Sequence, residues 1–591
     1  MSKRSTVMLM LIVLGLLAAC GAPAAPTSAP ANTPVPAANT PAPAATTAPT
    51  ANTPAPATTA GAVTPGLPSD AAAQDKQTLK IAWLGFGSQE PLAPWSVRWG
   101  GQAVAFSEFL SPMYHDVDFN LKPLLAASIT PNADKTVWTI KVNPNAVWSD
   151  GKKVTAGDMK ASWEWVTLPA QKTSNITGWA LTDAKGFADL AAGKATEMSG
   201  LVVKDDATLE VQLNNPDPFL DHKFAIYYLG VVPADKLKAD PQYLSKPNPV
   251  VNGPFQVTQI DTTGRQIVMN PNPKWWGSKP ILQQLQLIVA EEQTAFETLV
   301  EKGQVDFAYS FADVAGRQAL VKRAPGAAIL ANKLPIGIYA SFHAGVPPND
   351  DLNVRKALIH AIDFKQLATS ATDGTQQPWL AALHPELLRG CYNKDSENYF
   401  AFDPAKAKQE LAASKYGSVD KLPKLRVSSN STGASQQKAI QIIMEMWRTN
   451  LGINNIEFNT QPSGFGPDEK LLNVDRQSIG ARPPDDGLWI TQFNSAGIHA
   501  TRFMGGYKNE ALDKLLATVA SMDRKDSNFC PTVQQAEKLF LDDYMLIPLW
   551  RQSGDFGIIQ PWVKNVGFSP YLAPYGWFGD TPQAYISNAK K

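Results

Sequence analysis

Alternating apolar residues mark the first regular element of the folded chain. In residues 78–83, Leu79, Ile81 and Trp83 alternate with threonine, lysine and alanine. A period of two is typical of a β-strand with one face buried. We therefore expect a strand at this position.

A later region changes from the period of a strand to that of a helix and back. Apolar residues alternate over 285–289 and share one helical face over 296–300, before Gly303 and the strand-like segment "VDFAYS" over 305–310. Glycine is well suited to the left-handed cap that ends many helices. The pattern predicts a β-α-β unit, whose natural form joins parallel strands.

Similar alternation of helices and strands continues through the chain. Thr155, with Asp158 three residues later, resembles the capping box that begins a helix. Other segments have the periodicity or composition of regular elements. We expect strands over 137–142, 208–213, 225–232, 456–458 and 546–560, and helices over 354–362, 436–452 and 509–522. The economical fold is two α/β lobes connected near residues 330–345.

The N-terminus carries an export signal. Lys3 and Arg4 precede the apolar run Val7–Leu17, which is shorter than a membrane span. Small residues then lead into Cys20 in "GLLAACG", which resembles the bacterial lipobox. The resemblance implies that Cys20 is lipidated and anchors the mature protein to the membrane; an ordinary signal peptide is the alternative.

A low-complexity stalk follows the signal. Of the 55 residues from Gly21 to Asp75, 41 are alanine, proline or threonine. Such a segment cannot bury enough apolar surface to offset its ordering entropy, so we expect disorder. The whole chain has 53 basic and 53 acidic residues, and this balance argues against a nucleic-acid partner.

Six ordered blocks resemble the large extracytoplasmic solute-binding proteins of ABC importers, solute-binding protein family 5. The family includes oligopeptide-, dipeptide- and nickel-binding proteins. The blocks are "WTIKVNPNAVWSDGKKVTAGDMKASWEWV", "NGPFQVTQIDTTGRQIVMNPNPKWWG", "ETLVEKGQVDFA", "DLNVRKALIHAIDFKQL", "FDPAKAKQELAASKYG" and "MLIPLW". The resemblance implies the two-lobed α/β periplasmic-binding-protein fold (type II, large family-5 variety), with a discontinuous first lobe and a hinge cleft.

The resemblance also implies a division of the chain and a function. We expect a monomer outside the cytoplasm, anchored through its lipid, that binds a small solute and delivers it to an ABC permease without catalysis. The expected segments are a signal peptide (1–19), a stalk (20–75), lobe I (76–335), lobe II (336–545) and a C-terminal return to lobe I (546–591).

One segment of lobe II is similar to a ligand-binding motif of the peptide-binding relatives. Trp489 stands at the motif's aromatic position, and Gln492 stands where the relatives have an acid, followed by Phe493 and Asn494. A neutral amide cannot form the charge-assisted bond that the amino terminus of a peptide needs. Peptide and neutral oligosaccharide therefore both stay open as ligands, and the amide favours the oligosaccharide.

Aromatic residues supply further candidate contacts. Trp95 and Trp99 follow the first strand, where loops line the ligand crevice of open α/β sheets. Trp379 follows the 354–362 helix, a region that approaches the cleft in relatives, and Tyr114 is a similar candidate. Core packing is the alternative for each of them.

The remaining chemistry points away from metals, cofactors and catalysis. The six histidines contain no H-x-x-x-H pair, and the chain has no G-x-S-x-G elbow or P-loop. Once Cys20 carries lipid, Cys391 and Cys530 remain, and we expect them to pair in an oxidising exterior. An extracellular hydrolase on the same scaffold and a sensor for a membrane kinase stay open as alternatives.

The variant Gln492→Asp tests the candidate motif. We expect it to abolish binding of a neutral sugar and to favour a ligand that carries an amine, because a carboxylate forms charge-assisted bonds to ammonium groups. Calorimetric titration measures both affinities. Unchanged affinities would show that Gln492 does not contact the ligand.

Overall fold

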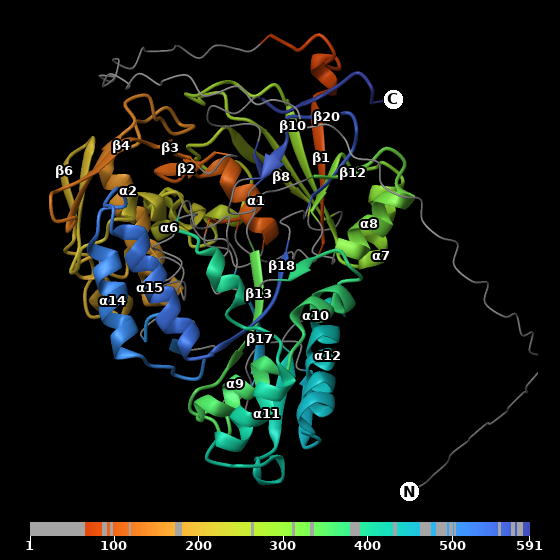
Figure 1. Cartoon of the computed structure of the whole chain (residues 1–591). Helices are drawn as coiled ribbons and strands as arrows, with labels where there is room; N and C mark the ends of the chain where they lie inside the picture. Colours follow the sequence, from red (N-terminus) through yellow and green to blue (C-terminus); the bar gives the residue numbers. More distant parts are fainter. Residues whose placement is uncertain are drawn as a thin grey trace, which may run out of the picture. The chain divides into compact units, whose positions relative to one another are not determined.

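The computed structural model describes most of the chain from residue 66 onward. The disorder expected for the stalk is wrong for its last residues, because Ala71 forms a β-bridge with Ser587 and Ala72 is buried. The described residues are 66–84, 92–94, 99–116, 120–171, 180–261, 265–309, 314–330, 336–378, 391–429, 434–460, 474–479, 493–495, 500–501, 504–552, 557–568, 574–575 and 583–590. All of them belong to one unit, Ala60–Lys591. Figure 1 shows their helices and strands, coloured along the sequence.

A central parallel strand organises the first sheet, which has seven strands among the described residues. Its order is β12–β19–β11–β1–β10–β9–β8. The strands are β1 (Thr78–Leu84), β8 (Phe255–Asp261), β9 (Gln266–Pro271), β10 (Gln284–Ala290), β11 (Phe307–Tyr309), β12 (Ala328–Leu330) and β19 (Gly557–Ile559). β1 is parallel to both β10 and β11, and α7 (Gln293–Glu301) connects those two neighbours. The predicted β-α-β unit with parallel strands is confirmed.

Residues from the C-terminus hold the start of β1. The Gln77 side chain donates a hydrogen bond from Nε2 to the Ile586 carbonyl (2.9 Å) and accepts one from the Ile586 N–H (2.8 Å). Asp306, which is 1% exposed, accepts a hydrogen bond from the Lys80 N–H and pairs with Lys590 Nζ at 2.7 Å. The last described residues therefore fix the start of the central strand through side-chain contacts, while β23 (Tyr585–Ile586) itself pairs with β20 outside this sheet.

The second sheet has six described strands in the order β14–β18–β13–β17–β15–β16. They are β13 (Ile336–Phe342), β14 (Gln377–Pro378), β15 (Leu425–Ser429), β16 (Ile456–Thr460), β17 (Val474–Ile479) and β18 (Leu546–Gln552). The helices of this region are α9 (Leu352–His360), α10 (Phe364–Ala371), α11 (Pro404–Ala413) and α12 (Ala434–Leu451). β15 and β16 are parallel, with α12 between them in sequence. α9 and α11 pack side by side (Figure 1).

Strand pairing changes one expected boundary. The sequence places the return to lobe I at residue 546, but β18 (Leu546–Gln552) pairs with β13 and β14 in the second sheet. The next strand, β19, pairs with β11 and β12 in the first sheet. The chain therefore crosses between the sheets after Gln552. The boundary was predicted too early in the sequence because the apolar pattern of 546–560 does not show which sheet each strand joins.

A third sheet has four described strands in the order β4–β5–β7–β6. They are β4 (Ala126–Pro131), β5 (Val137–Val142), β6 (Leu201–Asp205) and β7 (Thr208–Gln212), and α2 (Ala156–Thr167) packs against the sheet. The predicted capping box begins α2, because Thr155 Oγ1 accepts the Asp158 N–H and the Asp158 carboxylate accepts the Thr155 N–H.

The expected strand over 225–232 is wrong. Its middle is the 3₁₀ turn Tyr227–Leu229, and the Leu229 carbonyl accepts a hydrogen bond from Trp163 Nε1 at 3.1 Å. Phe224, just before it, stacks on the same Trp163 ring at 5.2 Å between centroids. Backbone hydrogen bonds of Leu229 and Val232 to Trp163 and Ser162 therefore hold this segment against α2 in place of pairing with a strand.

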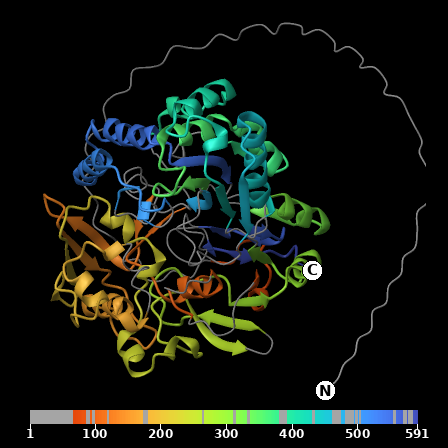
Figure 2. The same cartoon turned by 90° about the horizontal axis from the view of Figure 1, so that it is seen from below.

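Two antiparallel helices near the C-terminus lie beside the four-stranded sheet. They are α14 (Glu510–Ser521) and α15 (Phe529–Asp542), blue in Figures 1 and 2, with the sheet in orange to yellow. The other described elements are α1 (Trp99–Glu108), α4 (Phe187–Ala191), α5 (Leu220–Lys223), α6 (Ala234–Ala239), α8 (Val314–Arg323), β2 (Met113–His115), β3 (Leu121–Pro123), β20 (Val563–Lys564), β21 (Gly567–Phe568), β22 (Pro574–Tyr575) and β23 (Tyr585–Ile586). Within the described part of the chain, every helix is too short or too polar to cross a lipid bilayer.

A disulfide joins two distant segments. Cys391 and Cys530 are bonded, with the sulfur atoms 2.07 Å and the Cα atoms 4.5 Å apart. Cys530 lies in the first turn of α15, so the bond ties that helix to the segment around residue 391. Nearby, Gln534 Nε2 donates a hydrogen bond to the Cys391 carbonyl at 2.9 Å.

A buried carboxyl group connects α1 to the first sheet. Glu108 ends α1 and is fully buried. Its Oε1 accepts the N–H of Val257 in β8 at 2.6 Å. Burial raises the pKa of Glu108 to about 8, although the Val257 N–H opposes the shift. The side chain is therefore a neutral acid at pH 7.

This carboxyl makes stability depend on pH. Between the unfolded pKa of 4.5 and the folded pKa of about 8, the folded protein holds one more proton than the unfolded chain. Its free energy of unfolding therefore falls as pH rises through this range, by at most about 1.4 kcal/mol per pH unit. Glu108→Gln keeps an oxygen acceptor and does not titrate. We therefore expect the free energy of unfolding of this variant to stay constant where that of the parent decreases, so that the variant is more stable than the parent at pH 8. Urea unfolding across the range measures the difference, with exposed Glu292→Gln as control. Parallel pH profiles for parent and Glu108→Gln would contradict the assignment.

Candidate functional site

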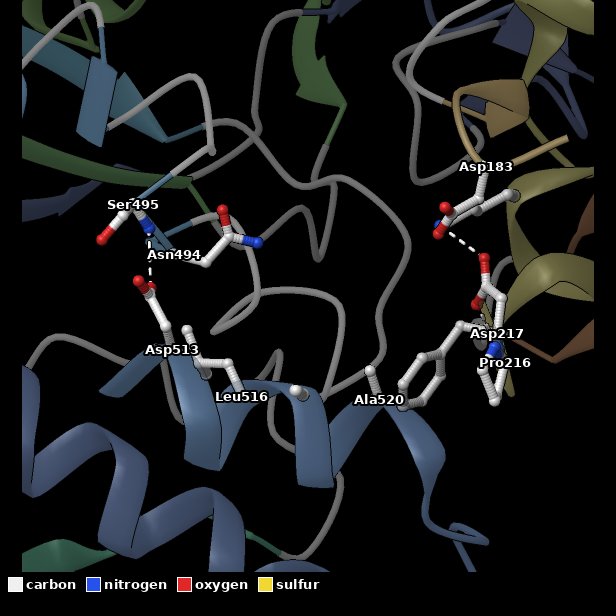
Figure 3. Close-up of a pocket in the computed structure, with 11 residues that line it drawn as sticks. Asp183, Pro216, Asp217, Asn494, Ser495, Asp513, Leu516 and Ala520 are labelled. Atoms are coloured by element: carbon white, nitrogen blue, oxygen red, sulfur yellow. Dashed lines mark hydrogen bonds and ion pairs between the residues drawn. The ribbon is translucent and has the colours of Figure 1, made fainter. Parts of the chain in front are cut away.

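A cavity of about 460 Å³ separates two segments that are distant in sequence. One wall is formed by Asp183, Pro216, Asp217, Phe219 and Lys223, from the loops that border the four-stranded sheet. The opposite wall is formed by Asn494, Ser495 and Asp513, and Leu516, Ala517 and Ala520 of α14 form the floor. Figure 3 shows Asp183 and Asp217 across the cavity from Asn494 and Ser495.

Local hydrogen bonds position the first wall. Asp217 accepts the Phe219 N–H at 2.9 Å and pairs with Lys223 Nζ at 2.6 Å. Asp183 accepts a hydrogen bond from Asn215 Nδ2 at 2.9 Å, which ties the loop before α4 to the loop after β7. This wall therefore has one carboxylate that is neutralised by a lysine and a second that is held by an amide.

The first turn of α14 positions the second wall. Asn509 caps the helix by accepting the Leu512 N–H at 2.9 Å, and its own N–H donates to Ser495 Oγ at 3.2 Å. Asp513 accepts the Ser495 N–H at 2.8 Å. Between these anchors, Asn494 Oδ1 is buried and has no hydrogen-bond partner among the described residues.

The lining combines negative charge with an apolar floor. Within the described lining, three carboxylates against one ammonium leave a net charge of −2. Asp183 and Asp513 lie on opposite walls, while Leu516, Ala517 and Ala520 present apolar surface from α14 (Figure 3). Carboxylates accept several hydrogen bonds each and attract cations, so the cavity suits a ligand with a cationic group and an apolar part.

The structure separates the sequence candidates. Asn494 lines the cavity. Phe493, by contrast, is 0% exposed and stacks on Phe540 with 4.3 Å between ring centroids, so we no longer assign it a ligand contact. Tyr114 in β2 is 8% exposed and packs in the core, the alternative considered for it.

The remaining candidates are not placed by the structure. Trp95, Trp379, Trp489, Gln492 and Cys20 lie outside the described residues. The same is true of the Trp99 side chain, although its backbone begins α1. No group of three or more histidine, cysteine or acidic side chains in the described part of the chain could hold a metal ion.

The four charged residues of the cavity were not predicted from the sequence. Asp217 lies in the turn "NNPDP", and Asp513 lies on the polar side of a helix whose apolar face alone was considered. Neither residue belongs to a motif with a chemical meaning. Only the tertiary structure brings residues 183–223 next to residues 494–520.

Comparisons with known proteins identify the family. The model of the bacterial extracellular solute-binding proteins, family 5 (middle region), matches residues 120–496. The oligopeptide-binding protein OppA of Bacillus subtilis (strain 168) is 25% identical over 79% of this chain and 84% of its own. The periplasmic murein peptide-binding protein MppA of Escherichia coli (strain K12) is 26% identical over 73% of this chain and 80% of its own.

A solved structure shows the same fold. The unliganded open form of MppA matches 88% of this chain and 99% of its own with a TM-score of 0.69, at 22% identity. The likeness confirms the mixed α/β, two-lobed architecture. These relatives are substrate-binding proteins rather than enzymes. The chain belongs to the bacterial extracellular solute-binding proteins of family 5.

Proposed function

We propose that this chain is the extracytoplasmic solute-binding subunit of an ABC importer and that its ligand is a short peptide with a cationic group. The charge of the cavity lining carries the proposal: Asp183 and Asp513 lie on opposite walls and accept N–H donors from Asn215 and Ser495. The names of the oligopeptide- and murein-peptide-binding relatives support the peptide class.

The carboxylates retain capacity for a ligand. A carboxylate has about four lone-pair positions, so a single N–H donor leaves room for an ammonium or guanidinium group. Asn494 Oδ1 offers a further acceptor for a peptide N–H, and Leu516 offers apolar contact. A ligand that touches both walls stabilises the state in which they face each other, in proportion to its preference for that state. The permease would then receive the protein in that state.

Neutralising the carboxylates tests the peptide proposal. Asp183→Asn and Asp513→Asn keep an oxygen acceptor and remove the charge. We expect each to weaken binding of lysine- or arginine-containing di- to hexapeptides about tenfold, because a hydrogen bond to a charged group contributes roughly 1.5–3 kcal/mol. A thermal-shift screen of the full chain finds the ligand, since a ligand specific for the folded state raises the melting temperature. Calorimetric titration then measures each variant.

Asp189→Asn is the matched control. Asp189 is exposed in α4 and does not line the cavity, so this variant removes the same charge nearby and should bind as the parent does. Neutral oligosaccharides that raise the melting temperature while cationic peptides do not would overturn the peptide proposal in favour of the sugar. Unchanged peptide affinity in both cavity variants would remove the cavity from the binding site.

We also propose that Cys20 carries a lipid that anchors the protein to the membrane. The charged, apolar and small residues that precede Cys20 stand in the order of a lipobox, and the Ala/Pro/Thr-rich segment after it gives the length of a stalk. A diacylglyceryl group with an amide-linked chain exceeds the two-chain requirement for stable anchoring.

Replacement of Cys20 tests the anchor. In a bacterial host that processes lipoproteins, we expect the parent in the detergent phase after Triton X-114 partitioning and Cys20→Ser in the aqueous phase, because the thioether cannot form. Ser5→Ala, a change in the same leader, should partition as the parent does. A parent protein found in the aqueous phase would contradict lipidation.

A further inference from the structure

One arginine connects the two walls at the end of the cavity. Arg524 follows α14 and reaches the turn that carries Phe219 on the opposite wall. Its guanidinium donates hydrogen bonds to His222 Nε2, to the Pro218 carbonyl (3.3 Å) and to the Asp221 carboxylate (3.2 Å). It also lies over the Phe219 ring, 5.2 Å from the centroid. These contacts join residues about 300 positions apart in the chain.

The hydrogen bonds define the protonation of two histidines. An arginine can only donate, so His222 Nε2 must be an acceptor and the His222 proton must sit on Nδ1. That Nδ1 lies 3.1 Å from His115 Nε2 in β2, which must therefore accept. In this arrangement both imidazoles are neutral, and the order of donors runs from Arg524 to His222 and from His222 to His115.

A proton on His222 Nε2 breaks this arrangement. The protonated nitrogen becomes a donor that faces the guanidinium, so a hydrogen bond is lost and two positive charges meet. A proton on His115 Nε2 breaks the other hydrogen bond of His222, because that nitrogen can then no longer accept the His222 Nδ1–H. An unperturbed imidazole titrates near about pH 6.5, within the range that bacterial surroundings reach.

The charged groups around His222 include both signs. The charged or titratable side chains on the elements packed around His222 are Asp221 and Lys223 on α5, His115 and the adjacent Asp116 at β2, and Asp523, Arg524 and Lys525 after α14. Asp221 is already paired with Arg524 and Lys223 with Asp217. Asp523 lies 3.9 Å from Lys135.

We propose that Arg524 and His222 form a latch that holds the two cavity walls together at neutral pH and releases them when His222 takes up a proton. The proposal rests on the proposed function only in that the cavity is taken as the ligand site. The latch makes the time that a ligand stays bound depend on the pH outside the cell. A peptide held at neutral pH is released faster in acid.

A distance measurement tests the latch without any ligand. Spin labels on Lys194→Cys and Lys514→Cys, two exposed positions on either side of the cavity, report the separation of the walls in the detergent-solubilised full chain. We expect the ratio of short to long distances to fall about fivefold between pH 7.5 and pH 5.5, the size expected for the loss of one hydrogen bond.

Three variants separate the latch from general acid effects. Arg524→Gln should show the acid-like distribution at both pH values. His222→Gln keeps an acceptor for Arg524 and does not titrate, so it should keep the short distance at both. Lys525→Gln removes the adjacent exposed charge and should behave as the parent. A parent distribution that does not change with pH, or an Arg524→Gln distribution like that of the parent at pH 7.5, would overturn the proposal.

The test is independent of the ligand. If the distances respond as expected while no peptide or sugar binds, the latch stands and the proposed function fails. If a peptide binds in the thermal-shift screen but the distances change neither with pH nor in Arg524→Gln, the proposed function stands and the latch fails.

Discussion

The burial of β1 between β10 and β11 is the constraint on which the first sheet depends. Both faces of this strand are covered, with Leu79 and Ala82 fully buried, and both neighbours arrive much later in the chain. A parallel pair requires a crossover connection, so α7 has to lie between β10 and β11 in sequence. The β19 strand then closes the far side of β11 from the C-terminal end. The sheet is discontinuous in sequence because β1 takes both of its partners from residues 284–309, and β11 takes its second partner, β19, from the C-terminal region.

The cavity has a similar origin in long-range packing. Its walls are held by short-range bonds, such as Asp217 to Lys223 and Asp513 to the Ser495 N–H, so each wall keeps its own geometry. Among the described residues, the contacts between the two sides include those of Arg524, the Phe219–Phe529 ring contact and the Lys135–Asp523 ion pair. Walls that are each held by their own local bonds can separate and re-form a binding site without losing their internal geometry.

Local chemistry predicted much of the fold, and tertiary chemistry decided the site. The capping box of Thr155 and the β-α-β unit follow from residues within one turn or one element, so they were predictable. The run at 225–232 was not, because a short apolar segment without periodicity does not distinguish a strand from a buried irregular turn. Phe493 was misjudged because its position in a motif does not show that its ring faces Phe540. No sequence motif marks Asp183 or Asp513 as a binding residue, because only the tertiary structure places the two carboxylates on either side of one cavity.

The Cys391–Cys530 bond makes the stability of the chain differ between cell compartments. For the exported protein that we propose, this link is absent before export, because cytosolic thiols stay reduced. A link across 139 residues contributes roughly 2–5 kcal/mol, a large share of the stability of an ordinary domain. The newly made polypeptide is thus easier to unfold for passage through a translocon. Oxidation on the far side then makes the exported form resistant to unfolding.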